Sequence, residues 1–112
     1  MKTFSILIIL LVFISCSGNN KKFNSRKWKH IDGTYNHRDD MVLDLMKNVL
    51  HKGIHYKEVE KLLGKPNENK FYKKITYETY YEFLNEEHRT LTIYFSEDSL
   101  ITNYKRNVWE SK

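Results

Sequence analysis

Apolar and polar residues alternate with a period of two through the C-terminal half of the chain. The pattern runs through residues 75–84, recurs in 89–96, and returns from about 100 to 109. This period is typical of strands with one buried face, and short polar turns between them predict a three-stranded antiparallel β-meander. The polar run 67–70 is expected to be a loop. In the first strand one set of alternate residues is expected on the buried face: Ile75, Tyr77, Thr79, Tyr81 and Phe83.

Before the meander the apolar spacing becomes helical. Residues 39–52 carry an apolar stripe with polar residues opposite, which predicts an amphipathic helix. Asp39 and Asp40 stand at its start, where the helix dipole favours negative charge. Two such helices, this one and a shorter one after Gly53, are expected to pack on one face of the meander and leave the other face exposed to water.

The second helix has clear start and stop signals. Gly53 suits the left-handed position that ends the first helix, His55 stands at the N-cap, and Gly64 ends the helix before Pro66. Its apolar residues fall on one face at helical spacing: Val59, Leu62 and Leu63. A helix of about two turns is unstable alone in water, so this one must pack against the rest of the domain.

This motif, placed between an amphipathic helix and a meander, resembles the small bacterial envelope lipoproteins of the BamE/SmpA type, whose fold is also that of β-lactamase-inhibitor-like domains. The matching positions are Gly53, Glu58, Val59, Leu62, Leu63, Gly64 and Pro66. His55 stands where the family usually has serine or threonine. The resemblance covers residues 39–104 and implies an α+β fold, with two N-terminal helices packed on one face of a three-stranded antiparallel β-meander.

The N-terminus has the features of an export signal. A basic residue precedes an apolar run, which is too short for a stable membrane span, and a small residue then precedes Cys16, the one cysteine of the chain. Residues 13–16 resemble a lipobox, which implies lipidation of Cys16 and firm anchoring, because two or more acyl chains hold a protein on a bilayer. An ordinary signal peptide with an incidental cysteine is the alternative.

We expect a signal peptide over 1–15, a flexible basic tether over 16–27 and the domain over 28–112. Ser17 stands where inner-membrane lipoproteins have aspartate, which by resemblance favours the outer membrane, facing the periplasm.

The excess of positive charge lies close to this cysteine. The chain has 19 lysines and arginines against 14 aspartates and glutamates, yet from residue 39 onward it is almost neutral. Five basic residues are candidates for contact with anionic lipid: Lys21, Lys22, Arg26, Lys27 and Lys29. Each gains about 1 kcal/mol near an anionic surface. A solvated linker is the alternative, and a nucleic-acid partner is not favoured, because the domain has no basic helix. Trp28 is expected to dock on the domain, with a place at the bilayer interface as the alternative.

The exposed face of the meander is the candidate partner surface. We expect it to carry Thr76, Tyr80, Thr92 and Tyr94. Tyrosine is favoured at protein interfaces, because it buries a large area and keeps a polar tip. The alternative is that strands simply favour tyrosine and threonine.

The sequence shows no catalytic constellation. His51 and His55 are separated by the helix-breaking Gly53, and the carboxylates are expected at scattered exposed positions. We therefore predict no enzyme activity, no metal site and no cofactor. The expected function is that of a non-catalytic, membrane-anchored envelope lipoprotein, an interaction or assembly adaptor at the outer membrane. By resemblance its partner is the outer-membrane β-barrel assembly machinery. The alternatives are a secreted-type protein inhibitor module and a solute- or glycan-binding lipoprotein.

Overall fold

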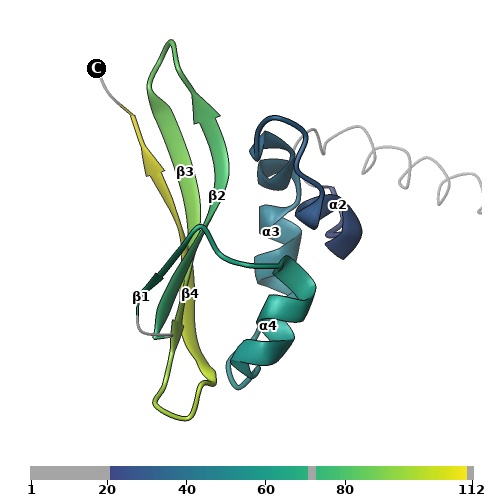
Figure 1. Ribbon diagram of the computed structural model, residues 1–112, viewed down its shortest axis with the longest axis vertical. Helices are drawn as coiled ribbons and strands as arrows, with labels where there is room; N and C mark the ends of the chain where they lie inside the picture. The colour runs from purple at the N-terminus through teal and green to yellow at the C-terminus, as the bar shows by residue number, and fades with distance from the viewer. Residues whose placement is uncertain (1–20, 71–72, 111–112) are drawn as a thin grey trace, which may run out of the picture.

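The computed structural model describes residues 21–70 and 73–110, which form an α+β domain. All the helical segments lie on one side of a twisted sheet (Figure 1). In chain order the elements are α2 (Ser25–Lys29), the 3₁₀ segment η1 (Asn36–Asp40), α3 (Val42–Asp44), the π segment η2 (Leu45–Val49), α4 (Tyr56–Leu63), β1 (Glu68–Lys70), β2 (Lys74–Glu82), β3 (Glu87–Phe95) and β4 (Ile101–Trp109). The signal peptide expected over 1–15 and the lipidation site Cys16 lie outside the described residues.

The sheet has four antiparallel strands in the order β1-β2-β3-β4, so the prediction of three strands is wrong in number. The additional strand, β1, forms in the polar run that was expected to be a loop, where Glu68 pairs with Thr76 and Lys70 with Lys74. All three residues of β1 are exposed, so it has no apolar alternation to reveal it in the sequence. Its backbone pairing with β2 overrides the low strand propensity of Asn, Glu and Lys.

The first predicted helix is present, but it is irregular and lies three residues earlier in the chain than expected. It begins at Asn36, passes through a 3₁₀, an α and a π segment, and ends at Val49 instead of Lys52. The N–H of Leu50 donates to the carbonyl of Leu45, five residues earlier, and the hydroxyl of Tyr104 donates to the carbonyl of Leu50 at 3.0 Å. This widened last turn buries Leu50 in the core, which explains why an apolar stripe extends past the true end of the helix.

The second helix matches its prediction closely. The Nδ1 atom of His55 caps α4 by accepting from the N–H of Lys57 at 3.0 Å. Gly53 and Gly64 both have positive φ, +95° and +78°, as their roles at helix ends require. Val59 and Leu63 are fully buried, while Leu62 is partly buried against the same core.

The segment between Gly53 and α4 also joins the helices to the sheet. The N–H of Gly53 donates to the carbonyl of Ile101 at 2.9 Å, and the N–H of Ile101 donates to the carbonyl of Ile54 at 2.8 Å. The N–H of Tyr56 then reaches the carbonyl of Ser99 at 2.8 Å. These backbone bonds fix α4 against the start of β4.

Residues 21–27 differ from the flexible tether expected for them. Phe23 packs against the core and its N–H donates to the Asp44 carboxylate at 2.8 Å. The hydroxyl of Ser25 donates to the carbonyl of Leu62 at 2.6 Å. Trp28 is completely buried and meets the ring of Tyr77 edge-on at 6.1 Å, so its expected docking is confirmed. The packed domain therefore begins before residue 28. Phe23 was not predicted as a core residue because the residues on both sides of it in the sequence are polar.

Candidate functional site

A β-bulge decides which side chains reach the outer face, the face of the sheet turned away from the helices. In β2 the register shifts, so that Glu78 pairs with Thr90 but Tyr80 pairs with Arg89, and Thr79 has no partner of its own. In such a bulge two consecutive residues, here Thr79 and Tyr80, stand opposite one residue of the partner strand, and both point to the same side. Tyr80 therefore lies on the inner side, and its ring is 4.5 Å from the Arg89 guanidinium.

Three residues of this region do not lie on the face of the sheet predicted for them. Tyr80 does not belong to the outer face, and Tyr81 takes its place there, because it pairs with His88. Phe83 was expected on the buried face but lies in the β2–β3 turn, 75% exposed. Strict alternation of residues predicts an unbroken strand, and one inserted residue reverses every side chain beyond it.

The other three predicted surface residues do lie together on the outer face. Thr76, Thr92 and Tyr94 line a shallow hollow of about 380 Å³. The hydroxyls of Thr76 and Thr92 are 3.5 Å apart, and the side-chain amide of Asn107 donates to the Thr92 hydroxyl at 3.3 Å. The centre of this face is thus polar and hollowed, not a flat row of tyrosines.

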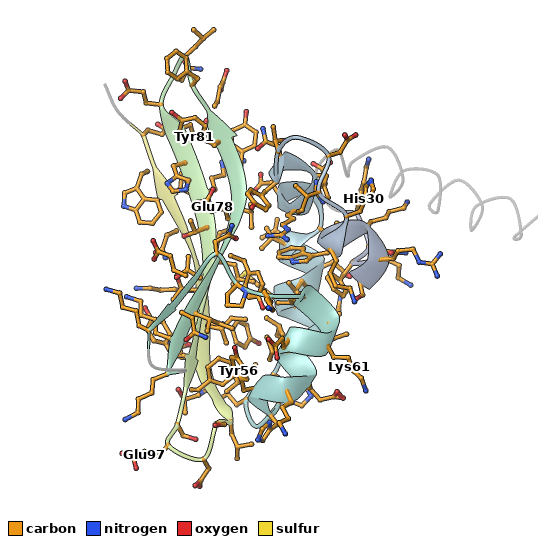
Figure 2. All side chains as sticks on the ribbon, in the orientation of Figure 1. His30, Tyr56, Lys61, Glu78, Tyr81 and Glu97 are labelled. Atoms are coloured by element: carbon orange, nitrogen blue, oxygen red, sulfur yellow. The ribbon has the colours of Figure 1, made fainter. Side chains whose placement is uncertain are left out.

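One end of the sheet carries an unusual set of exposed apolar side chains, which we call the apolar end. Phe83 and Leu84, at the tip of the β2–β3 turn, are 75% and 86% exposed. Tyr81 contacts His88 edge-on, and His88 contacts Trp109 at a ring separation of 5.4 Å. Figure 2 shows Tyr81 near this end of the sheet and Glu97 at the opposite end. The apolar end comprises Tyr81, Phe83, Leu84, Val108 and Trp109.

An ion cluster connects the 3₁₀ segment η1 to the inner side of the sheet. The carboxylate of Asp39, on η1, accepts from Arg89 and from Arg106, the latter at 3.2 Å. The Thr79 hydroxyl donates to the same carboxylate at 3.4 Å, and Arg89 also pairs with Glu87. Burial lowers the pKa of Arg89, but the bonds to Glu87 and Asp39 together outweigh it, and the net effect is to raise the pKa.

Sequence reasoning missed this cluster. Asp39 was expected at an exposed helix start, but it is buried at the interface between η1 and β3. Its partners Arg89 and Arg106 follow 50 and 67 residues later, so no local spacing reveals them. The cluster balances two carboxylates against two guanidinium groups, and each group is held by the others, which is typical of a structural ion network.

A second buried arginine holds the N-terminal segment. Arg38 is enclosed by aromatic rings, with its guanidinium carbon 5.0 Å from the Trp28 ring and 4.7 Å from the Tyr35 ring. Its Nε donates to the carbonyl of Trp28 at 3.0 Å, and its Nη1 donates to the carbonyl of Glu78 at 3.3 Å. Burial lowers the pKa of Arg38. These contacts connect α2 to β2 and point to a structural role.

The five basic candidates for lipid contact are all exposed, and the segment that carries them, which includes α2, lies on the helix side of the sheet (Figure 1). Lys21 is 3.9 Å from the Asp40 carboxylate, and the ammonium of Lys29 donates to the carbonyl of Lys61 at 3.1 Å. The other three are Lys22, Arg26 and Lys27. The structure does not bring this group together with the outer face, because the sheet lies between them.

Within residues 21–70 and 73–110, no group of three or more potential metal ligands comes together. Over the same residues no helix is both long enough and apolar enough to span a bilayer. No family model, curated protein or solved structure matches this chain. The resemblance to BamE/SmpA-type lipoproteins therefore stays a hypothesis that rests on the motif between Gly53 and Pro66.

Proposed function

We propose that this protein is a non-catalytic, lipid-anchored envelope protein that acts as an adaptor and binds a partner protein through its apolar end. The observation that carries the proposal is the exposure of Phe83 and Leu84 at the tip of a turn, where polar residues normally stand. Contiguous exposed apolar side chains on a soluble domain mark an interaction surface. Phe83 and Leu84 have the size and position of anchor residues that fill pockets on a partner.

The charges around this end support one class of partner. Glu82 and Glu86 flank the two apolar residues, in a chain whose overall charge is +5. An apolar tip with a negatively charged border complements a hydrophobic pocket with a basic rim. By the resemblance, the outer-membrane β-barrel assembly machinery is the proposed source of such a pocket.

The proposed lipid anchor rests on the lipobox-like residues 13–16 of the sequence. Lipidation of Cys16 would hold the chain at a membrane, with the outer membrane and its periplasmic face favoured by the resemblance. The basic side chains of α2 lie on the helix side, so contact with anionic headgroups there would turn the outer face of the sheet away from the bilayer. Such an orientation leaves the sheet and its apolar end free for a partner.

In-cell photo-crosslinking tests the partner site. A benzophenone amino acid placed at Leu84 should capture one envelope protein, and the same group at Leu43, an exposed leucine of α3, should not. Phe83→Ser should reduce capture from Leu84 without unfolding the domain, because Phe83 lies outside the core. Equal capture at the two positions, or none at Leu84, would contradict the adaptor proposal.

Metabolic labelling tests the anchor separately. A palmitate analogue should label the wild-type chain, and Cys16→Ser should abolish both the label and the recovery of the protein in the membrane fraction. An unlabelled wild-type protein that is released from cells would favour the secreted-inhibitor alternative.

A further inference from the structure

The centre of the outer face is a floor of small polar side chains from three neighbouring strands. Thr76 of β2 pairs with Thr92 of β3, while Thr90 of β3 lies between Glu78 of β2 and Asn107 of β4. All five line the hollow. Because these strands run side by side, their hydroxyl and amide groups, with the carboxylate of Glu78, form an array of donors and acceptors about 5 Å apart across the sheet.

One of these groups is left unsatisfied. Thr90 is only 3% exposed, and its hydroxyl has no hydrogen-bond partner in the described part of the chain. Burial of an unpaired hydroxyl is unfavourable, so such a group in a native protein calls for a specific explanation. Thr90 lines the hollow, so a ligand seated there can supply the missing partner.

The two ends of the hollow differ in character. At one end Trp109 and His88 stand side by side, and the indole is half exposed. Toward the other end the Lys74 ammonium lies 5.9 Å from the Tyr94 ring, and Lys105 pairs with Thr92. With Lys70, these lysines outnumber the two carboxylates that also line the hollow, Glu68 and Glu78. Tyr94 and His88 are six residues apart on one strand, which places the two ends roughly 20 Å apart.

We propose that this hollow binds an acidic oligosaccharide. A sugar ring presents an apolar face to the Trp109 indole, its hydroxyls bond to Thr90 and Asn107, and an acidic substituent lies near Lys74 and Lys105. A purely apolar ligand would leave the floor unpaired, and a small inorganic anion would leave most of the hollow unfilled. This inference requires neither the lipid anchor nor a partner at the apolar end, although the hollow and the apolar end share Trp109.

The full-length protein in detergent is titrated with hyaluronan tetrasaccharide, which is acidic, and with chitotetraose, which is neutral. The chain has two tryptophans, and Trp28 is buried, so a change in indole fluorescence reports on Trp109. We expect a saturable change with the acidic sugar and binding at least tenfold weaker with the neutral one. No saturable change with either sugar would overturn the proposal, and equal affinity for both would overturn its acidic part.

Two variants make the test specific. Thr90→Val removes the hydroxyl but keeps the shape, so it should weaken sugar binding at least tenfold while the melting temperature stays the same or rises. Lys105→Gln should weaken binding of the acidic sugar and leave the neutral one unchanged. Unaltered binding by Thr90→Val would refute the proposed site.

A control variant and a second assay separate this site from the adaptor surface. Phe83→Ser, in the apolar end, should bind sugar as the wild type does, and Thr90→Val should leave partner crosslinking from Leu84 unchanged. Loss of only one of the two activities therefore identifies which proposal fails. Capture of a protein by a crosslinker at Lys105, unaffected by added sugar, would assign the outer face to a protein instead.

Discussion

The carboxylate of Asp39 accepts from Arg106, 67 residues later, and so joins the 3₁₀ segment η1 directly to β4, the last strand. Arg89 of β3 donates to the same carboxylate. A single buried acid thereby fixes the position of η1 on two neighbouring strands. Removal of one partner from such a network leaves the others buried without compensation, which costs more than the bonds themselves contribute.

We therefore expect Asp39→Asn to lower the free energy of unfolding by about 2–3 kcal/mol, because two guanidinium groups lose their counter-charge. Asp40→Asn is the matched control, since Asp40 makes a solvent-exposed ion pair with Lys21 and its loss should cost less than about 1 kcal/mol. Urea unfolding of both variants measures the difference. Equal losses would show that the Asp39 cluster contributes nothing particular to stability.

Thr90 and Thr79 are both buried threonines of the sheet, but only one has a bonded hydroxyl. Thr79 donates to Asp39, and the hydroxyl of Thr90 has no partner among the described residues. Thr79→Val should destabilise the domain by about 1 kcal/mol, while Thr90→Val should be neutral or stabilise it by up to about 1 kcal/mol. Chemical denaturation of the two variants distinguishes them. A clear loss of stability in Thr90→Val would mean that its hydroxyl is satisfied in solution.

A better N-cap residue at position 55 should stabilise α4. His55 accepts the N–H of Lys57 through a ring nitrogen, which is an uncommon N-cap, and a carboxylate at this position also favours the helix dipole. We expect His55→Asp to raise the free energy of unfolding by about 0.5–1 kcal/mol. His51→Asp, at an exposed position outside any helix, makes the same change of charge and should have little effect. Urea denaturation measures the free energy of unfolding of both variants. An equal increase in the two would contradict the assignment of His55 as the cap.

The fold was predictable where the burial pattern is regular. Val59, Leu62 and Leu63 pack as their spacing indicates, and Leu91, Ile93 and Phe95 of β3 are buried as expected. Periodicity detects the residues that face the core, but it does not predict that Thr90 and Thr92 are also buried, on the outer face of β3.

The candidate site was only partly predictable, for physical reasons. Strand β1 is wet on both faces and shows no period, and the bulge at Thr79 reverses the faces of Tyr80 and Tyr81 without a signal in composition. Thr90 is buried on the outer face because of its neighbours across the sheet, which a single strand does not specify. The pairing of distant strands and the local register of β2 therefore determine which side chains form the candidate site, and sequence patterns do not reveal either one.

Asp44 gives the domain a pH dependence with a defined sign. The backbone N–H of Phe23 and the side-chain amide of Asn48 hold the pKa of Asp44 below its usual value. A lowered folded-state pKa contributes stability that is present above the unfolded value, near 4, and is lost as pH falls through the folded one. Asp44→Asn should thus lose up to about 1 kcal/mol at pH 7, since the carboxylate is largely exposed, and the gap from wild type should narrow as the pH falls below about 4 through the folded-state pKa. Urea unfolding from pH 7 to 3 tests this, and a gap as wide at pH 3 as at pH 7 would contradict it.

The basic side chains of α2, together with Lys22 just before it, form a surface (the α2 surface) that should confer salt-dependent attraction to anionic membranes. Replacement of Lys22, Arg26 and Lys27 by glutamine removes three exposed positive charges, none of which forms an ion pair within the described residues. Each such charge near an anionic bilayer is worth about 1 kcal/mol, and the attraction falls off within a Debye length.

The Cys16→Ser chain, which has no acyl anchor, should therefore bind vesicles rich in phosphatidylglycerol at low salt, and the triple variant should bind much more weakly. Replacement of Lys57, Lys65 and Lys73 by glutamine, the same charge change elsewhere on the surface, is the control. If both triple variants lose binding equally, net charge rather than the α2 surface accounts for the attraction.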